Sequence, residues 1–276
     1  QPKSEDGGAT SVARTSSSRS VVWDSGGASF QLTLEQREGH QLAAYEGEWG
    51  SSKATRAVVE DIQGRTFPKD SPNPMTKEDV TRSIDYFIKA VDAKDKSDAE
   101  KHAALRYAAS LPSSLLTLDD LRHAVARRGS RTRKGAGAGL PVVAIGGPTS
   151  AFRMTSLLVR LHEHDKKKKQ QEGSDDTTHN NNRFVFPKFE EELPSPVITC
   201  LSLLDAVDKY VVGNTDAYLK DLGFPQYEMV GPKVCLVLGV MRYLGMPSFQ
   251  YVPTVGSTLG IAEAFANGTL FGAPKL

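Results

Sequence analysis

The sequence contains few cysteines, no long apolar run and almost no net charge. Its 276 residues include two cysteines, Cys200 and Cys235, and its formal net charge is +1. Two cysteines do not make the disulfide framework of a small secreted protein, so we expect a cytoplasmic location. The longest apolar stretch, Met229–Met246, contains Lys233 and Arg242 and predicts a buried helix, so we expect no membrane partner. The near-zero charge gives no general attraction to nucleic acid, and we expect none as a partner.

The most informative stretch is Ser20–Leu34, with the sequence SVVWDSGGASFQLTL. Residues 21–23 are typical of a half-buried strand. Residues 30–34 alternate apolar and polar side chains, which is the period of a strand with one buried face. Gly26 and Gly27 lie between the two segments, where a tight connection requires positive φ angles. The stretch therefore predicts a β-hairpin.

The glycine turn of this hairpin is also a candidate anion site. Such a turn exposes consecutive backbone N–H groups, which form a nest for an anion. Asp24 ends the first strand and would lie beside a bound anion. A carboxylate beside a phosphate usually shares a magnesium ion with it, so the sequence predicts Mg²⁺ at Asp24.

The rest of the chain predicts a sheet with helices on its faces. Residues 1–19 have the composition of a disordered tail or linker. A turn at 38–40 and a returning strand at 41–45 complete an antiparallel meander. Helical segments are expected over 53–62 and from Thr76 to Val91, where Thr76 begins a helix-start pattern.

Two insertions are expected, at about 93–138 and 163–193. The first would contain short helices at 98–109 and 118–128 and the basic run Arg127–Lys134, which we interpret as a solvated linker, the alternative being a polyanion site. The second contains the low-complexity stretch 166–182, expected to be a disordered loop. We interpret His162, His164 and Asp165, next to this stretch, as a solvated face and not as metal ligands.

The apolar run Leu140–Ile145 predicts a central strand. It continues through Gly146 and Gly147 into a helix over 151–161. A strand that runs through glycines into a helix is a generic phosphate-binding arrangement, although a tight turn alone would also need the glycines. The remaining sequence predicts helices at 199–212, 215–222, 232–244 and 257–266, and a strand at 248–252.

This order of elements predicts an α/β fold. Strands joined through helices lie parallel to their neighbours, so the result is a five-stranded mixed sheet flanked by helices. That topology is the ribonuclease-H-like lobe of the actin-like ATPases. Residues 20–272 would form one such lobe.

The residues Asp24–Leu32, DSGGASFQL, resemble the second phosphate motif of the exopolyphosphatase and guanosine-pentaphosphate phosphatase (Ppx/GppA) family, roughly Asp-x-Gly-Gly-Gly-Ser-x-Glu-Leu. Three later stretches are similar to that family in the same order: Trp49–Thr55, Val143–Gly147 and Tyr227–Ala264. The first motif is specific, and the others contribute through order and spacing.

The resemblance implies a hydrolase that removes terminal phosphate from polyphosphate or guanosine polyphosphate by Mg²⁺-assisted attack of water. It assigns Asp24 to the metal and Gly146 and Gly147 to a second phosphate loop. The residues implied to cradle the phosphate are Gly26, Gly27, Ala28 and Ser29. It also implies a partner N-terminal lobe, absent from this chain, that would supply the general base, and a possible homodimer.

Two residues depart from the family pattern. Gln31 stands where the family has Glu, so it would position a water molecule and would not act as a base. Pro148 removes one backbone donor from the second loop. Two alternatives therefore stay open: a non-catalytic sensor of phosphate or nucleotide with the same fold, and an apyrase-like nucleotide phosphohydrolase, whose Asp-x-Gly-Gly-Ala-Ser-x-Gln motif matches Asp24–Gln31.

Overall fold

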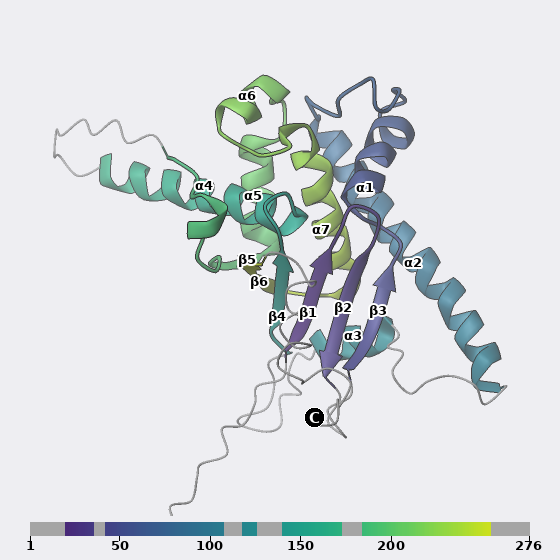
Figure 1. Cartoon of the computed structure of the whole chain (residues 1–276). Helices are drawn as coiled ribbons and strands as arrows, with labels where there is room; N and C mark the ends of the chain where they lie inside the picture. The colour runs from purple at the N-terminus through teal and green to yellow at the C-terminus, as the bar shows by residue number, and fades with distance from the viewer. Residues whose placement is uncertain (1–19, 36–41, 108–117, 126–139, 173–183, 255–276) are drawn as a thin grey trace, which may run out of the picture.

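The computed structural model describes residues 20–35, 42–107, 118–125, 140–172 and 184–254. Its centre is one mixed sheet with the strand order β3-β2-β1-β4-β6-β5. The strands are β1 (Val21–Ser25), β2 (Phe30–Glu35), β3 (Leu42–Gly47), β4 (Val142–Gly146), β5 (Val197–Thr199) and β6 (Ser248–Pro253). Figure 1 shows β1 inside the sheet, between β2 and β4.

The predicted meander and the parallel strands are confirmed. β1 pairs antiparallel with β2 and β2 antiparallel with β3. β4 pairs parallel with β1, and β6 pairs parallel with β4. The expected number of five strands is wrong, because Val197–Thr199 forms a sixth strand, antiparallel to β6. Thr199, which the sequence predicts to begin a helix, is both the end of β5 and the N-cap of the helix that follows.

Alternating burial along the strands defines the core face of the sheet. Val21, Trp23 and Ser25 are buried, whereas Val22 and Asp24 are less so. The Trp23 ring lies 4.7 Å from that of Phe152, centroid to centroid. Such edge-to-face aromatic contacts add to the free energy gained by burying the rings. Helix α4 (Ala151–Glu172), which carries Phe152, thus packs on the core face.

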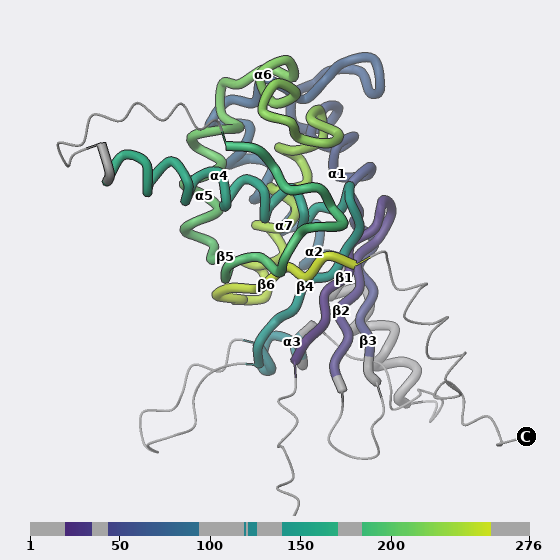
Figure 2. The backbone as a smooth tube through the Cα atoms, turned by 60° about the vertical axis from the view of Figure 1, so that its left-hand side comes forward, coloured from purple at the N-terminus to yellow at the C-terminus, as the bar shows by residue number. Residues whose placement is uncertain are grey.

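The described helices lie on that one face (Figures 1 and 2). They are α1 (Ser51–Ala57) with a π-helical turn (Val58–Ile62), α2 (Lys77–Tyr107), α3 (Leu118–Val125), α4 (Ala151–Glu172), α5 (Cys200–Tyr210), α6 (Asp216–Asp221) and α7 (Val230–Leu244). The 3₁₀ turns Phe189–Glu191 and Tyr227–Met229 complete the described elements. The expected closing helix at 257–266 lies outside the described residues.

Two expectations about helix length are wrong. α2 runs without a break to Tyr107, so no separate helix begins at residue 98. α4 continues to Glu172 and includes the first part of the low-complexity stretch. Lysine and glutamine are good helix formers, which explains why the polar sequence extends the helix. Residues 1–19, the turn at 38–40 and the basic run after Val125 lie outside the described residues.

The central helix is α7. Its residues are buried except Arg242, and it packs against α1, α2, α4 and α5. Gly239 permits this contact, since a Cβ there would lie 2.7 Å from the Cβ of Phe87. The prediction of a buried helix is confirmed. Among the described helices, none is long and apolar enough to cross a membrane.

Candidate functional site: two glycine loops at one edge of the sheet

The first glycine loop, residues 26–29, joins β1 to β2. It is closed by a hydrogen bond from the Gly26 amide to the Ser29 carbonyl, 2.9 Å long. Its outer carbonyls are held by the start of α1: the Ser51 amide donates to Gly26 O and the Ser52 amide to Gly27 O, at 3.0 and 2.9 Å. Helix α1 has no side-chain cap, so the loop itself caps the first amides of the helix.

Close backbone packing fixes this loop. A Cβ at Gly50 would lie 2.4 Å from the Ala28 nitrogen and from the Gly27 carbonyl carbon. Only glycine fits there. The expectation that Gly26 and Gly27 need positive φ angles is wrong, since neither is among the described residues with positive φ. The connection has four residues and not two, so it does not need the left-handed turn of a two-residue hairpin.

The second glycine loop, residues 146–150, follows β4. The Ser150 amide donates to Gly147 O at 3.1 Å, which makes residues 147–150 a β-turn. Pro148 occupies the second position, where its fixed φ is favourable and its missing N–H is not needed for the turn. Gly146 is sterically required, because a Cβ would lie 2.5 Å from the Ser150 Cβ.

Three side chains hold the other carbonyls of this second loop. Tyr251 Oη donates to Gly146 O at 2.9 Å. Arg153 Nη1 donates to Pro148 O at 3.0 Å. Lys233 Nζ donates to Thr149 O at 2.7 Å. These carbonyls therefore face the protein.

The amides of both loops face the opposite way. In a planar trans peptide the N–H points away from the C=O of the same unit. The N–H groups of Gly27, Ala28, Gly147 and Thr149 therefore point away from the groups that hold the preceding carbonyls. Among the described residues, none of these four amides donates a backbone hydrogen bond. Free backbone amides of this kind can bind an anion.

The sheet brings the two loops together. β1 and β4 are parallel neighbours, with Asp24 opposite Ile145. Their carboxyl ends therefore meet at one edge, and the loops that follow them start side by side. Ligands of open α/β sheets bind at this end of the strands. Asp24 lies at the point where the two loops diverge.

Asp24, Gln31 and Glu46 form a row across three strands. Asp24 is paired with Gln31, and Gln31 with Glu46. Directly opposed residues share a face, so the row lies on the face of the sheet away from the core. Gln31 and Glu46 are exposed and Asp24 is half-buried. Burial raises the pKa of Asp24, while a hydrogen bond from the Ser25 backbone opposes that rise.

The row suits a metal ion only if the ligand supplies further oxygens. The described part of the chain contains no group of three or more acidic, histidine or cysteine side chains placed to hold a metal. Mg²⁺ commonly binds through one or two carboxylates together with substrate phosphates. Asp24, half-desolvated and beside two phosphate-type loops, fits that shared arrangement and not an all-protein site.

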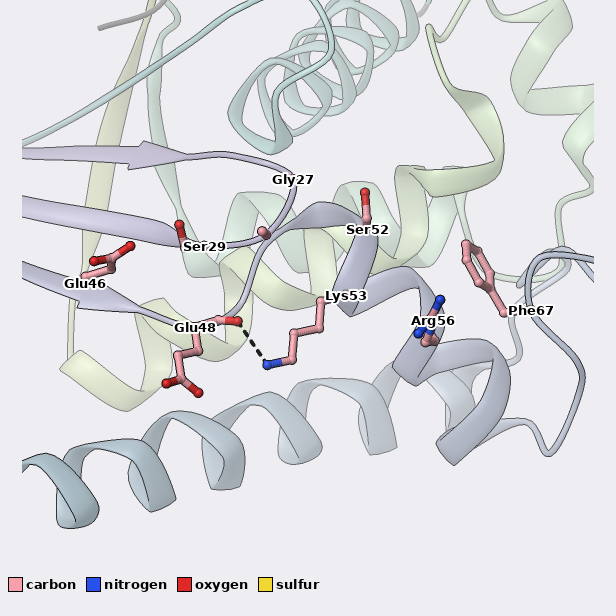
Figure 3. Close-up of a pocket in the computed structure, with 9 residues that line it drawn as sticks. Gly27, Ser29, Glu46, Glu48, Ser52, Lys53, Arg56 and Phe67 are labelled. Atoms are coloured by element: carbon pink, nitrogen blue, oxygen red, sulfur yellow. Dashed lines mark hydrogen bonds between the residues drawn. The ribbon is translucent and has the colours of Figure 1, made fainter.

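A cavity of about 820 Å³ opens beside the first loop. It is lined by Gly27, Ala28, Ser29, Glu46, Glu48, Ser52, Lys53, Arg56 and Phe67. Figure 3 shows the two glutamates toward one end, the Arg56 and Phe67 side chains at the other, and Lys53 between them. Lys53 Nζ donates to the Glu48 carbonyl at 3.2 Å. Asp24, Gly146 and Gly147 do not line this cavity, which lies on the meander side of the loop.

Sequence reasoning missed the cavity's charged residues. Lys53 and Arg56 were available as a signal, because they are three residues apart on an expected helix and share a face. Glu46 could be found only from the register of β3. The expectation of a solvated face at residues 162–165 is wrong for His162, which is buried against Tyr210. Asp165 accepts hydrogen bonds from Lys209 and Tyr210, so this group is structural.

No protein-family model and no curated protein matches the sequence. In contrast, 31 chains of solved structures match. An exopolyphosphatase from Cytophaga hutchinsonii is 12% identical over 91% of this chain and 57% of its own, with a TM-score of 0.50. The likeness is one of fold. A Ppx/GppA family member from Aquifex aeolicus is 11% identical over 90% and 57% of the two chains, with a TM-score of 0.47. An exopolyphosphatase-like protein is 14% identical over 95% and 64%, with a TM-score of 0.47.

The chain thus shares the fold of exopolyphosphatases, and it spans about 57% of the length of the first solved structures it matches. The expected α/β architecture is confirmed by the mixed sheet and its helices.

Proposed function

We propose that the chain is one lobe of a Ppx/GppA-like phosphohydrolase, which removes terminal phosphate from polyphosphate or guanosine polyphosphate. The observation that carries the proposal is the meeting of two anion-type loops at the carboxyl ends of β1 and β4, with Asp24 between them. The fold shared with the Cytophaga hutchinsonii exopolyphosphatase supports it. The proposed partner lobe would complete the site.

Each residue has a role in this proposal. The amides of the loops at Gly26–Ser29 and Gly146–Thr149 bind phosphoryl oxygens and stabilise negative charge on them. Asp24 is the residue that would hold Mg²⁺, with phosphate oxygens as the further ligands. A bound Mg²⁺ would supply charge neutralisation at the reacting phosphoryl group. Gln31, opposite Asp24 in the strand register, orients water through its amide and accepts no proton.

Lys53 and Arg56 extend the proposed site along the substrate. Both line the cavity that begins at Gly27–Ser29. A chain of phosphates whose end sits on the first loop would run into this cavity and meet their positive charges. The Arg56 guanidinium lies 5.5 Å from the Phe67 ring centroid, which orients it by a cation–π contact.

The test is phosphate release from polyphosphate by a protein that contains this chain and its partner lobe. Asp24→Ala is expected to abolish Mg²⁺-dependent release with no loss of folded protein. The 276-residue chain alone is expected to bind polyphosphate and release none. An unchanged rate in Asp24→Ala removes that residue from the site, and turnover by the isolated chain contradicts the need for a second lobe.

A sensor without catalysis is the second candidate function. It is favoured by Gln31, since an amide is not a base, in the position where the resemblance implies Glu. The two candidates differ in one measurement. Binding of polyphosphate or guanosine polyphosphate by the complete two-lobed protein, with no phosphate release at any Mg²⁺ concentration, supports the sensor. An apyrase-like activity would instead appear as release of phosphate from nucleoside triphosphates.

A further inference from the structure

Lys233 is a buried cation behind the second glycine loop. It lies in the first turn of α7, and its side chain is among the largest that are fully buried, with 1% of the residue exposed. Its ammonium donates to Thr149 O at 2.7 Å and to Gln226 Oε1 at 2.5 Å. Within the described part of the chain, no carboxylate lies within ion-pair distance of it. A buried charge that has only neutral partners is costly, and it calls for an explanation.

The neighbouring cation of the same loop is neutralised. Arg153 Nε lies 2.7 Å from Glu192 Oε2, and both side chains are buried. The ion pair contributes no net charge to the loop, whereas Lys233 does. The two cations hold consecutive carbonyls, Pro148 O and Thr149 O, but only one of them acts as an unbalanced charge.

The partner of Lys233 is itself held in an unfavourable conformation. Gln226 has a φ of 48°, the only positive φ at a non-glycine residue among those described. Such a conformation costs free energy and persists where the surroundings enforce it. Here it brings the Gln226 side-chain carbonyl onto the Lys233 ammonium. The ammonium group comes from α7, and one of its two acceptors comes from the turn that precedes this helix.

We propose that Lys233 is a positioning residue for an anion on the second loop, which it serves by fixing the Thr149–Ser150 peptide and by placing an unpaired positive charge directly behind the loop. This inference rests on the proposed phosphate-binding function of the loop. The Ser150 amide of the fixed peptide closes the turn onto Gly147 O, so that Lys233 sets the orientation of the turn whose free amides face the ligand. An anion in the loop supplies the negative charge that the buried ammonium lacks.

The charge of Lys233 is sensitive to pH. Burial lowers its pKa to about 8, opposed by the field of Glu228. Two helices packed against α7 carry charged groups near it. Arg153 of α4 is paired with Glu192, and the charge of Asp79 on α2 raises the pKa of Cys235. A lowered lysine pKa means that the ammonium is lost as pH rises through about 8, and anion binding is expected to weaken over the same range. A bound anion should raise the pKa of Lys233 in return.

The test is titration of the 276-residue chain with inorganic tripolyphosphate by calorimetry. Lys233→Met is expected to weaken binding about tenfold at pH 7, because it removes the positive charge behind the loop and frees the Thr149–Ser150 peptide. The ratio of wild-type to variant affinity is expected to fall toward one by pH 9.5. Arg242→Met is the matched control, since it removes a positive charge from an exposed position of the same helix, and its affinity should stay within about twofold of wild type.

Each possible result of this titration either supports or overturns the role of Lys233. Equal affinity in Lys233→Met, or a ratio that does not change with pH, overturns the role of Lys233 and leaves the proposed function standing. A wild-type chain that binds no tripolyphosphate overturns the proposed function and this inference with it. If Lys233→Met does not fold, the side-chain NMR of Lys233 in the unmutated chain replaces it: the pKa should rise on addition of tripolyphosphate, and an unchanged pKa overturns the inference.

Discussion

The two glycine loops present free amides in the same way, but different forces hold them. At the first loop, the carbonyls of Gly26 and Gly27 accept from the uncharged amides that begin α1. At the second loop, the carbonyls of Pro148 and Thr149 accept from Arg153 and Lys233. The first loop is thus shaped by backbone contact and the second by buried charge.

Within one candidate site, backbone packing therefore fixes the first loop and buried charged side chains fix the second. Among the described residues, backbone amides hold the Gly26 and Gly27 carbonyls of the first loop, and the nearby cations Lys53 and Arg56 line the open cavity. The second loop has its cations on the protein side, out of solvent. Hydrogen bonds from charged donors are stronger than neutral ones, and buried charges are screened less by salt. We therefore expect binding at the second loop to resist salt better than binding at the first.

The largest expected effect comes from the charge that holds the second loop. Arg153→Met leaves the Glu192 carboxylate buried without its partner. Breaking a buried pair in this way costs about 3–5 kcal/mol of the free energy of unfolding, which urea denaturation would measure. Lys77→Met is the control, because its ion pair with Asp208 is exposed and should contribute about 0–1 kcal/mol. Similar losses in the two variants would show that the buried pair has no special role.

The next effect tests the backbone contact of the first loop. Gly50→Ala places a Cβ 2.4 Å from the Ala28 nitrogen, and such overpacking should destabilise the fold by about 3 kcal/mol and weaken tripolyphosphate binding. Gly239→Ala is the matched control: it clashes with Phe87, far from the loops, and should lower stability without changing the affinity of the folded fraction. Normal binding by folded Gly50→Ala would contradict the role of this contact.

A clash at the second loop should be smaller and reversible. The Cβ of Gly146→Ala would meet the Ser150 side chain, at 2.5 Å from its Cβ, with an expected cost of about 2 kcal/mol. Because the obstacle is a side chain, adding Ser150→Gly should restore part of the lost stability, as seen in thermal denaturation of the single and double variants. At Gly50 the obstacle is backbone, so no such rescue exists. A double variant no more stable than Gly146→Ala would contradict this distinction.

The smallest effect concerns Asp24, which lies between the loops. Burial raises the pKa of its carboxyl in the folded state, so the folded protein binds this proton more tightly than the unfolded chain does. Its contribution to stability is therefore present below the unfolded pKa, near 3.8, and is lost as pH rises through the folded pKa.

Asp24→Asn should accordingly stabilise the fold at pH 7, by about 0.5 kcal/mol, and lose Mg²⁺-dependent phosphate binding. The gain should disappear in denaturation measured at pH 3. A loss of stability at pH 7 would instead show that ionised Asp24 is a structural group. A gain in stability together with a loss of binding is what a functional carboxylate predicts.

Much of the central sheet could be predicted from local pattern. The alternation of Phe30, Leu32 and Leu34 determines which face of β2 is buried, and the apolar run before Gly146 identifies β4. The short strand β5 could not be predicted, because three residues, Val197–Thr199, carry too little periodic signal and are stabilised by pairing with β6. The continuation of α2 was missed for a related reason, since a polar segment gives no apolar face to follow.

The candidate site, like the sheet, has parts that could be predicted from the sequence and parts that could not. The motif from Asp24 to Ser29 and the glycines at 146–147 were visible in the sequence, because the chemistry of a phosphate loop requires particular residues next to one another. That the two turns meet at one edge is a finding of the structure, which follows from the parallel register of β1 and β4. The mechanism, the metal, the homodimer and the cytoplasmic location remain predictions.

Two glycine-rich turns after strands, with a carboxylate beside the first, can be recognised from neighbouring residues alone. The groups that hold each turn from the protein side come from the packing of distant segments. Lys233 reaches Thr149 across 84 positions of the chain, and Glu192 reaches Arg153 across 39. In the sequence, Lys233 is one charge in an apolar helix, because burial and hydrogen-bond partners depend on how helices pack and not on which residues adjoin.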